Sequence, residues 1–317
     1  MKQSDIAPPV VIVAGPTASG KSALALGLAA SLGGTIINAD SQQSYRDLPI
    51  LSAQPDDAAM RRVTHRLYGF LDAAERGSVA RWRTLALTEI TAAHAAGRLP
   101  ILVGGTGLYL RALQHGLAPV PEIPQTVRAE AAALYRELGG AKFLERLAML
   151  DPDTASRLPP GDRSRLARAF EVVRATGIPI GAWRSRGAGE APYRFATLLL
   201  MPLREVLYPA CDARFTAMIA AGAVDEVSVL AGRGLAPDLP AMKAVGVPEL
   251  LRHLRGEMPL ADAIAAAQRS TRRYAKRQMT WFRHQMTADL LFTEQFSESL
   301  LRRSRHFIDQ FLLTARE

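Results

Sequence analysis

The sequence has little cysteine and no long apolar run, and both shortages limit what the protein can be. Cys211 is the only cysteine in 317 residues, so no disulfide forms within the chain and cysteine-based metal sites are excluded. No stretch of about 18 uninterrupted apolar residues occurs, so no membrane span is predicted. Residues 1–10 lack the apolar segment of a signal peptide. We therefore expect a cytoplasmic protein with no membrane partner.

Acidic residues are also fewer than basic ones. The chain has 39 Lys and Arg against 30 Asp and Glu, a net charge of +9. This excess fits a polyanionic partner, although basic charge alone is weak support for one. The six histidines show no metal-ligand spacing, so a zinc site is not predicted. A hydrophobic content of 48% is typical of a globular protein with a real core.

Short apolar runs alternate with helical patterns in the first third of the chain. Residues 10–14 form a β-branched run that ends in glycine, which predicts a buried parallel strand. Residues 22–34 have helical spacing and a glycine stop, and residues 35–40 form a second apolar run. Residues 99–103 form a third, followed by a glycine turn. The alternation predicts an α/β fold with a parallel sheet.

The composition changes near residue 115, where proline density rises. Helical patterns alone follow from about residue 125 to 185, and an apolar run then returns to a strand. We therefore predict a P-loop parallel-sheet core with an α-helical insertion domain. Residues 1–120 form the first part of the core, 121–190 the insertion, and 191–317 the returning strand with C-terminal helices. The last residues, 302–317, are expected to form a terminal helix or a loose tail.

The segment "GPTASGKS" fits G-x-x-x-x-G-K-[ST] at every fixed position, between a predicted strand and a predicted helix. Glycines let backbone N–H groups curl around anionic oxygens, and the helix dipole points at them. Lys21 adds a charge, and the Ser22 hydroxyl suits Mg²⁺. A chance glycine-rich turn is the alternative, and the context disfavours it. The predicted diphosphate-binding residues are Gly15, Pro16, Thr17, Ala18, Ser19, Gly20, Lys21 and Ser22.

A second acid that usually accompanies nucleotide hydrolysis is missing. Such proteins carry an apolar strand ending in Asp, which helps to hold Mg²⁺. The third predicted strand ends "ILVGGTG", without an acid, and the acid at a strand end is Asp40. The loop therefore suits a diphosphate, while the means of cutting ATP is not evident.

Polar residues follow the second predicted strand in "NADSQQSY". Ligands of open α/β sheets bind at the C-terminal ends of strands, so Asp40 should face the crevice of the phosphate loop. A carboxylate there can take a proton from a nucleophile. Ser41, Gln42 and Gln43 suit the edge of a base. Asp40 also fits a helix N-cap, and the spacing alone leaves both interpretations open.

The glycine turn "VGGTGLY" places Thr106 at the end of the third predicted strand. Its hydroxyl can point into the same crevice. Taken alone, a plain strand-to-helix turn is the better interpretation.

Two predicted helices are rich in basic residues. Arg165 and Arg168 are three residues apart and share a helix face. In residues 268–285, Arg269, Arg273 and Arg277 repeat every four residues and line one stripe, and Tyr274, Trp281 and Phe282 are interleaved with the basic residues of the segment. Cations bind phosphates and aromatic rings stack on bases. Solvated helices with core-facing aromatics are the alternative. The two helices and the positive charge together favour RNA.

Five segments occur in the order in which they are found in one protein family: "GPTASGKS", "NADSQQSY", "VGGTGLYLRAL", "DRSRLARAFEVV" and "RYAKRQMTWFR". Over residues 10 to 285 the chain resembles the tRNA dimethylallyltransferases, or tRNA isopentenyltransferases, of the bacterial type. The resemblance implies transfer of a dimethylallyl group from dimethylallyl diphosphate to N6 of the adenine next to the anticodon of tRNA. It implies Mg²⁺ and the tRNA anticodon stem-loop as partners. We expect a monomer.

The resemblance also assigns roles to residues. It implies that the phosphate loop binds the prenyl diphosphate and that Asp40 is the general base. Thr106 and Arg128 match positions next to the target, and Thr106 is expected to be catalytic together with Asp40. The sequence departs from the family pattern at Gln54, Arg81 and Ser164. The tRNA-binding residues implied are Asp40, Ser41, Gln42, Gln43, Thr106, Arg128, Ser164, Arg165, Leu166, Ala167 and Arg168.

Three other functions remain as alternatives. A P-loop kinase of a small metabolite would use Asp40 to activate a hydroxyl, but leaves the basic helices unexplained. A non-catalytic RNA-binding module leaves Asp40 only a capping role. An enzyme that prenylates free adenine nucleotides would not need a second, RNA-gripping domain.

Overall fold

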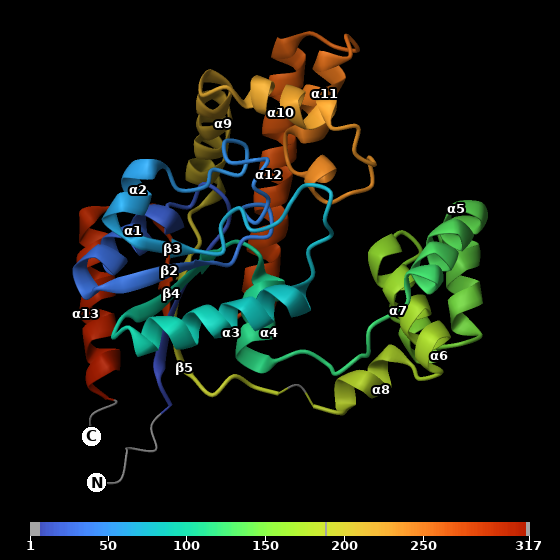
Figure 1. Ribbon diagram of the computed structural model, residues 1–317, viewed down its shortest axis with the longest axis horizontal. Coiled ribbons are helices and arrows are strands. Elements are labelled where there is room, and N and C mark those ends of the chain that lie inside the picture. The colour runs from blue at the N-terminus through green and yellow to red at the C-terminus, as the bar shows by residue number, and fades with distance from the viewer. Residues whose placement is uncertain (1–6, 188, 315–317) are drawn as a thin grey trace. The chain divides into compact units, whose positions relative to one another are not determined.

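The computed structural model describes residues 7–187 and 189–314 (Figure 1). The expectation of no signal peptide concerns a segment of which residues 1–6 lie outside this range. The chain divides into two compact units, one made of residues up to Gln114 together with those from Ala191 onward, the other of His115–Glu190. The second unit is thus inserted into the sequence of the first.

The first unit contains a six-stranded parallel sheet in the order β3-β2-β4-β1-β5-β6. An α/β fold with a parallel sheet is therefore confirmed. The strands are β1 (Pro9–Ala14), β2 (Gly34–Asn38), β3 (Thr64–Arg66), β4 (Leu99–Gly104), β5 (Arg194–Leu200) and β6 (Leu290–Phe292). Strands β3 and β6, three residues each, lie at the edges and were not predicted, because three residues carry no readable periodicity.

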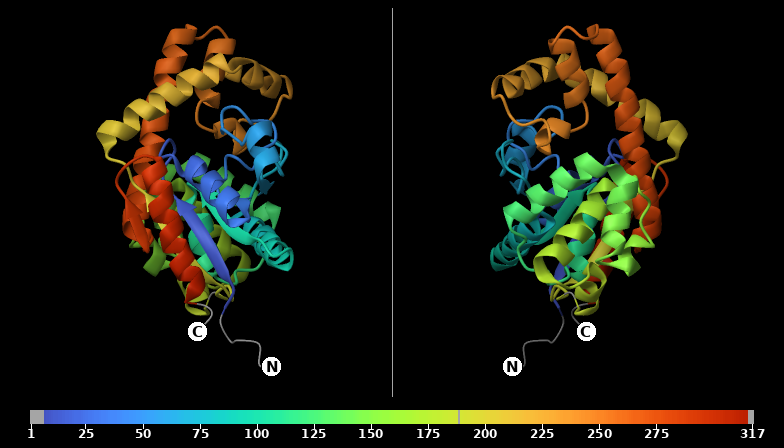
Figure 2. Two further views of the ribbon diagram at one scale, coloured as in Figure 1. Left: turned by 90° about the vertical axis from the view of Figure 1, so that its left-hand side faces the viewer. Right: turned by 90° about the vertical axis from the view of Figure 1, so that its right-hand side faces the viewer.

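Both faces of the sheet are covered by helices, which explains why its central strands are continuous apolar runs. Val11 and Val13 of β1 pack with α1 (Lys21–Leu32) and α13 (Glu298–Leu313), while Val10 and Ile12 pack with α3 (Val79–Ala95) and α4 (Gly107–His115). Alternate residues of a strand point to opposite faces, so the run fills two core layers. Figure 2 shows α1 and α13 from the side.

The strand order places the site. From β1 the chain runs to β2 and β3 on one side of the sheet, and from β4 it runs to β5 and β6 on the other side. The strand order therefore reverses between the neighbouring strands β1 and β4. Crevices at such points receive ligands in parallel sheets. The phosphate loop follows β1, Asp40 follows β2, and Thr106 follows β4. These three strands are neighbours, and all three loops leave the same edge.

Helices from the last third of the chain complete the first unit. A separate apolar cluster joins Leu48 and Leu51 to helices that follow β5. Helix α12 (Leu260–Gln285) runs without a break from this cluster to the sheet, burying Ala267 at one end and Phe282 at the other. The remaining elements are α2 (Asp57–Arg62), α9 (Arg204–Ala220), α10 (Ala223–Gly232), the 3₁₀ turn η1 (Ala241–Lys243) and α11 (Val247–Leu254).

The second unit is helical and has its own core. Phe143, Leu166 and Phe170 are fully or almost fully buried in one apolar cluster. Its first helix is broken at Gly139, which has φ 70°. The helices are α5 (Gln125–Ala148), α6 (Pro152–Ala155), α7 (Arg163–Thr176) and α8 (Ile180–Ser185).

No single helix in residues 7–187 and 189–314 has both the length and the apolar character needed to cross a bilayer. By length and composition alone, α9 and α10 taken together would qualify, but they are bent by 67°. Both helices bury apolar residues in the first unit.

Candidate active site

The phosphate loop requires glycine at both of its fixed glycine positions. A Cβ at Gly15 would lie 2.6 Å from the carbonyl oxygen of Leu200. A Cβ at Gly20, which has φ 89°, would lie 2.7 Å from Cβ of Phe296. The loop is therefore pressed against neighbouring backbone and side chains and tolerates no other residue there without a shift.

Backbone groups of the loop are satisfied in two ways. The carbonyl of Pro16 accepts from Nζ of Lys21 and from the N–H of Ser19, both at 3.3 Å. The N–H of Thr17 donates to Oε1 of Gln278 at 2.8 Å, and the carbonyl of Ala18 accepts from Gln295 at 3.2 Å. The sequence did not single out either glutamine.

Asp40 is held in a turn, not at the start of a helix. Its Oδ1 accepts from the N–H of Gln42 at 3.1 Å, and its own N–H donates to Oδ1 of Asn38 at 2.8 Å. Residues 41–56, all of which the structure describes, contain no helix. The N-cap interpretation of Asp40 is therefore wrong. The side chain is almost fully buried, and its position in the turn is well defined.

Thr106 is tied to the same turn. Its hydroxyl oxygen accepts from the N–H of Ser41 at 2.9 Å and donates to the Ser41 hydroxyl at 3.2 Å. Its backbone N–H donates to the carbonyl of Ala39 at 3.3 Å. The structure thus brings Thr106 against the residue after Asp40, where it fixes the turn that presents the carboxyl.

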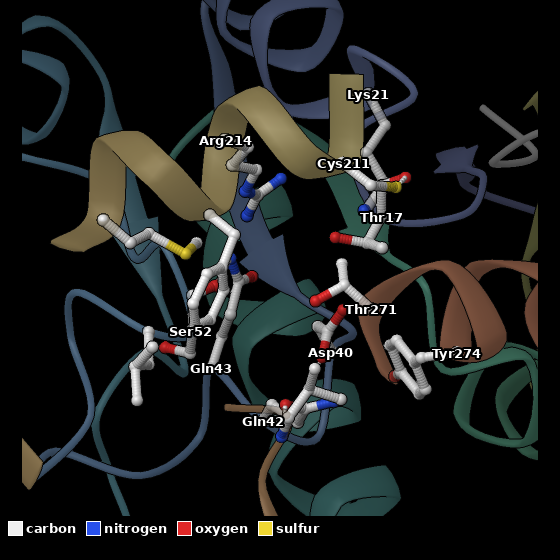
Figure 3. Close-up of a pocket in the computed structure, with 14 residues that line it drawn as sticks. Thr17, Lys21, Asp40, Gln42, Gln43, Ser52, Cys211, Arg214, Thr271 and Tyr274 are labelled. Atoms are coloured by element: carbon white, nitrogen blue, oxygen red, sulfur yellow. Dashed lines mark hydrogen bonds between the residues drawn. The ribbon is translucent and has the colours of Figure 1, made fainter. Parts of the chain in front are cut away.

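A cavity of about 530 Å³, including its open mouth, joins the phosphate loop to Asp40 (Figure 3). The side chains of Thr17, Lys21, Asp40 and Arg214 converge on it. Its lining contains both polar and apolar residues. The lining residues are Thr17, Lys21, Asp40, Gln42, Gln43, Leu51, Ser52, Cys211, Arg214, Phe215, Met218, Val245, Thr271 and Tyr274.

Lys21 carries a charge that the protein interior disfavours. The side chain is 7% exposed, and burial lowers its pKa from the usual 10.5 to about 8. Asp40 raises this pKa and Arg214 lowers it, both to a lesser extent than burial. A buried cation of this kind is stabilised by an anion placed beside it.

Arg214 of α9 supplies the second cation of the cavity and was not predicted. Burial lowers its pKa, while Asp40 and Cys211 raise it. Among the described residues it forms no hydrogen bond or short ion pair. The cavity is lined at helical spacing by Cys211, Arg214, Phe215 and Met218. The feature of the sequence that could have predicted Arg214 is therefore an arginine within an otherwise apolar stripe of a helix.

Helix α9 is fixed to α12 beside this arginine. The guanidinium of Arg272 contacts both carboxylate oxygens of Asp212, at 2.5 and 2.6 Å. Asp212 lies two residues before Arg214, so this ion pair helps to set the position of the second cation.

Cys211 and Tyr274 complete the electrostatics of the cavity. Burial raises the pKa of the Cys211 thiol to about 11, which keeps it neutral and unreactive. Burial also raises the pKa of Tyr274, with a smaller contribution from Asp40. Two cations therefore face one carboxyl in a cavity whose other groups are neutral.

Gln42 and Gln43 each use part of their amide on the protein. Oε1 of Gln42 accepts from the N–H of Val245 at 3.1 Å. Nε2 of Gln43 donates to the carbonyls of Ser52 and Ala53 at 3.0 and 2.7 Å. A side-chain hydrogen bond also links Gln42 to Tyr274, so Gln43 has its oxygen left for anything that enters the cavity.

Ser22 does not line the cavity that holds Asp40. It lines a neighbouring hollow of about 640 Å³, which Gln43 and Asp56 also line. No group of three or more His, Cys, Asp or Glu suited to a metal exists in the part of the chain that the structure describes. A lone hydroxyl still suits Mg²⁺ bound mainly through phosphate oxygens and water.

The second unit presents basic residues expected to bind RNA. Arg165 extends into solvent from α7, with its carboxylate neighbour Asp162 at 3.4 Å. Arg168 lies 3.7 Å from Glu171, and Arg128 of α5 acts on the same carboxyl. The structure thus brings Arg128 and Arg168 near one another.

The neighbours of these arginines on α7 differ in exposure. Ser164 is exposed and Ala167 is half-buried. Leu166 is fully buried in the core of the second unit, so its side chain is not offered to RNA. The spacing of Arg165 and Arg168 on one face explains why Leu166 between them points inward.

The basic stripe of α12 is also exposed. Two of the three aromatic residues of this helix are not a stacking platform, while the third, Tyr274, lines the cavity. Arg269, Arg273 and Arg277 lie at the surface. Phe282 is fully buried against the sheet, and the indole of Trp281 packs over Gly107, where a Cβ would lie 2.0 Å from it. Phe282 and Trp281 therefore belong to the packing of the first unit.

Known proteins share this sequence and arrangement. Residues 43–285 match the model of a family described as IPP transferase. The chain is 60% identical over 282 residues to the tRNA dimethylallyltransferase of Rhodospirillum centenum, which is 88% of this chain and 90% of that protein. It is 53% identical over 310 residues to the tRNA dimethylallyltransferase of Paramagnetospirillum magneticum, covering 97% and 98% of the two chains.

The chain belongs to this family. Its fold agrees with solved structures: the tRNA isopentenylpyrophosphate transferase of Bacillus halodurans has a TM-score of 0.69 at 33% identity, with 98% of each chain covered. A eukaryotic dimethylallyltransferase acting on tRNA has a TM-score of 0.84 at 25% identity, covering 97% of this chain and 80% of that one. The resemblance to this family in sequence motifs is confirmed.

Proposed function

We propose that the protein transfers the dimethylallyl group of dimethylallyl diphosphate to N6 of the adenine next to the anticodon of tRNA. The bond from N6 to C1 of the prenyl group forms as the bond from C1 to the diphosphate oxygen breaks. One N6 proton passes to Asp40, and diphosphate leaves. Membership of the family and the pairing of two buried cations with one carboxyl in a single cavity support this reaction.

The phosphate loop binds the donor in this proposal. Lys21 and Arg214 place two positive charges on the leaving diphosphate, and the burial of Lys21 strengthens the attraction. Backbone N–H groups at the start of α1 add to it. The Ser22 hydroxyl would be the protein's ligand for Mg²⁺, which would supply further neutralisation of the leaving group.

Asp40 activates the acceptor. The exocyclic amine of adenine is a poor nucleophile, so removing its proton as the new bond forms lowers the barrier. Oδ1 of Asp40 is tied to the N–H of Gln42, which leaves Oδ2 for the amine. Thr106 holds the turn in place through Ser41. The adenine reaches the cavity by leaving its stack, at a cost of a few kcal/mol.

We assign RNA binding to exposed basic residues of the helical insertion. Arg128, Arg165 and Arg168 contact phosphates, with Ser164 and Ala167 beside them, while Ser41, Gln42 and Gln43 contact the flipped nucleotide. We further propose that the protein acts as a monomer in the cytoplasm, where its tRNA substrate is found. Light scattering of the purified chain tests the monomer.

The reaction is tested with purified protein, Mg²⁺, dimethylallyl diphosphate and unmodified tRNA. The expected products are N6-prenylated adenosine beside the anticodon and one diphosphate for each transfer. ATP-dependent phosphorylation of a small metabolite, or RNA binding with no product, would contradict the proposal. Free AMP or ADP offered in place of tRNA is the matched control, and we expect no transfer to it.

A further inference from the structure

Two side chains from distant parts of the sequence hold the backbone of the phosphate loop, and the proposed chemistry uses neither. Oε1 of Gln278, on α12, accepts from the N–H of Thr17 at 2.8 Å. Nε2 of Gln295, between β6 and α13, donates to the carbonyl of Ala18 at 3.2 Å. These contacts join residues more than 250 positions apart in the sequence.

Gln278 is buried and connects two parts of the site. Its Nε2 donates to the carbonyl of Gly105 at 2.9 Å, in the turn after β4. A Cβ at Gly105 would lie 2.2 Å from that nitrogen and 3.2 Å from Oδ2 of Asp40. One amide group thus spans from the donor loop to the backbone beside the proposed base.

Because peptide bonds are planar, these hydrogen bonds fix the orientation of the peptide groups of the loop. In a trans peptide the C=O and N–H point in opposite directions. Because Gln278 takes the N–H of Thr17, the carbonyl of Pro16 faces the other way, where Lys21 and the N–H of Ser19 donate to it. Both of these contacts are 3.3 Å, longer than the usual hydrogen bond of about 2.9–3.0 Å.

The hydrogen bond from Gln295 orients the Ala18–Ser19 peptide. With the carbonyl of Ala18 held by Gln295, the N–H of Ser19 points to the opposite side. Ala18 has φ 61°, a left-handed conformation that a residue with a side chain adopts only when its surroundings enforce it. Gln295 is one of the groups that enforce it.

The segment that carries Gln295 is anchored at both ends. β6 pairs with β5 before it, and α13 packs on α1 after it. Phe296 lies against Gly20 at the start of α1. The loop is therefore covered by a fixed segment, residues 293–297, and not by a free tail.

We propose that Gln278 and Gln295 are positioning residues for donor binding. They orient the Pro16–Thr17 and Ala18–Ser19 peptides so that Nζ of Lys21 and the N–H of Ser19, which donate to the same carbonyl, are placed together for the diphosphate. Gln278 also sets the position of this loop relative to the turn beside Asp40. The inference rests on the proposed function in taking the bound anion to be the diphosphate of the donor.

The direct test is titration of Gln278→Met and Gln295→Met with Mg²⁺ and inorganic diphosphate by calorimetry. Methionine keeps the length of the side chain and removes its hydrogen bonds. We expect each variant to bind diphosphate about 3- to 10-fold more weakly than the wild type, because each loses its one hydrogen bond to the phosphate loop.

Gln268→Met is the matched control for Gln278. Gln268 is on the same helix, and its amide donates to the carbonyl of Asp212 and the hydroxyl of Thr216, away from the loop. Gln310→Met on α13 is the matched control for Gln295→Met, since the amide of Gln310 contacts only His306 in the described structure. Both controls should retain wild-type affinity for diphosphate.

Steady-state kinetics with tRNA and dimethylallyl diphosphate distinguishes the role of Gln278 from that of Gln295. Gln295→Met should raise KM for the donor and leave kcat unchanged. Gln278→Met should raise KM and also lower kcat, because the turn of Gly105 beside Asp40 loses its contact. A general loss of stability would not produce this difference between the two variants.

Folded variants that bind diphosphate as tightly as the wild type would overturn the proposal, and so would an equal loss in Gln268→Met. If Gln278→Met does not fold, Gln295→Met, whose side chain is only half-buried, decides the question. A wild-type chain that binds diphosphate but does not prenylate tRNA would defeat the proposed function alone. A wild-type chain that binds no diphosphate would defeat both.

Discussion

The positive charges of this protein are of two kinds, those inside the cavity of the first unit and those on α7 of the second. Lys21 is 7% exposed, and burial lowers its pKa to about 8. The side chain of Arg165 is 72% exposed and has a carboxylate, Asp162, 3.4 Å away. One charge is held at a cost in free energy, and the other is solvated at almost none.

The difference explains what each group can do. A buried cation interacts strongly with an anion placed beside it, because little water screens the pair. An exposed cation contributes roughly one kcal/mol or less to any one pair, and salt weakens it. The cavity is therefore suited to holding one small anion in a fixed place, and α7 to holding a large polyanion through many weak contacts.

The largest effect should come from the acid opposite the buried cations. Asp40→Asn keeps the shape of the side chain and an oxygen for the N–H of Gln42, but cannot take the proton. We expect kcat to fall by about 10²- to 10⁴-fold, the usual contribution of a general base. Single-turnover kinetics at saturating donor measures it.

The tRNA affinity of Asp40→Asn, measured by filter binding, should stay close to that of the wild type. A kcat that does not change would eliminate Asp40 as the base. A loss of tRNA affinity as large as the loss of kcat would make Asp40 a binding residue.

The next largest effect concerns Lys21. Lys21→Met should lower kcat/KM for the donor by about 10²- to 10³-fold, since it removes one charge stabilising the leaving group. The same change should stabilise the protein, because a buried charge is removed. A pKa lowered from 10.5 to about 8 corresponds to a cost of up to about 3 kcal/mol at pH 7.

The sign of this second effect can be checked against pH. Between pH 8 and 10.5 the unfolded chain binds the lysine proton and the folded chain does not, so the Lys21 contribution to stability becomes less unfavourable as pH rises. The gain in free energy of unfolding from Lys21→Met should therefore be largest below pH 8 and shrink above it. Urea denaturation at pH 7 and pH 9.5 measures both values. A variant less stable than the wild type at pH 7 would contradict the assignment of a buried charge.

A smaller effect is expected in donor binding itself. The loop binds diphosphate through protonated Lys21, whose pKa is about 8 in the free protein. Affinity should be steady below pH 8 and fall by about tenfold for each pH unit above it, until the pKa of the complex is reached. Calorimetric titration of a non-reactive donor analogue across this range measures the slope. Lys21→Arg, which does not titrate there, should remove it; the same slope in that variant would assign it to another group.

Much of the first unit could be predicted from the sequence because its signals are local. The β-branched run before Gly15 and the glycine–lysine pattern after it lie within a dozen residues, and the fold they predict is the one found. Asp40 was expected in the same crevice, since neighbouring parallel strands end at one edge. The structure places its carboxyl on the wall of the cavity.

The parts that were missed depend on contacts between distant residues. Arg214, Gln278 and Gln295 reach the site from α9, α12 and the segment after β6. Gln278 lies in the matched segment "RYAKRQMTWFR", but that motif assigns it no role, and no short motif marks the other two. Arg214 and Gln278 do share one feature, a polar residue within a buried helical stripe. Such a residue needs a partner, and the sequence does not say which one. Leu166 shows the opposite kind of error. It was predicted to bind tRNA because it lies within a matched motif, but its side chain is buried in the core of the second unit.

The smallest effect is expected on α7, and it tests the exposed side of the comparison. Arg165→Ala should weaken tRNA binding by about 3- to 10-fold and reduce the slope of log affinity against log salt by about one. Arg174→Ala is the control on the same helix: nine residues along, it lies about 180° around the axis, and its guanidinium is engaged by Glu130 at 3.1 Å.

Filter binding from 50 to 200 mM salt, a range in which such contacts weaken strongly, measures both variants. Arg165 lies outside the cavity and is proposed to contact tRNA phosphates, so its loss should leave kcat at saturating tRNA unchanged, unlike that of Lys21. An Arg165→Ala variant with wild-type affinity and salt slope, or an Arg174→Ala variant with an equal loss, would remove this face of α7 from the RNA-binding surface. Neither outcome would contradict the role proposed for Lys21 and Arg214 in the reaction.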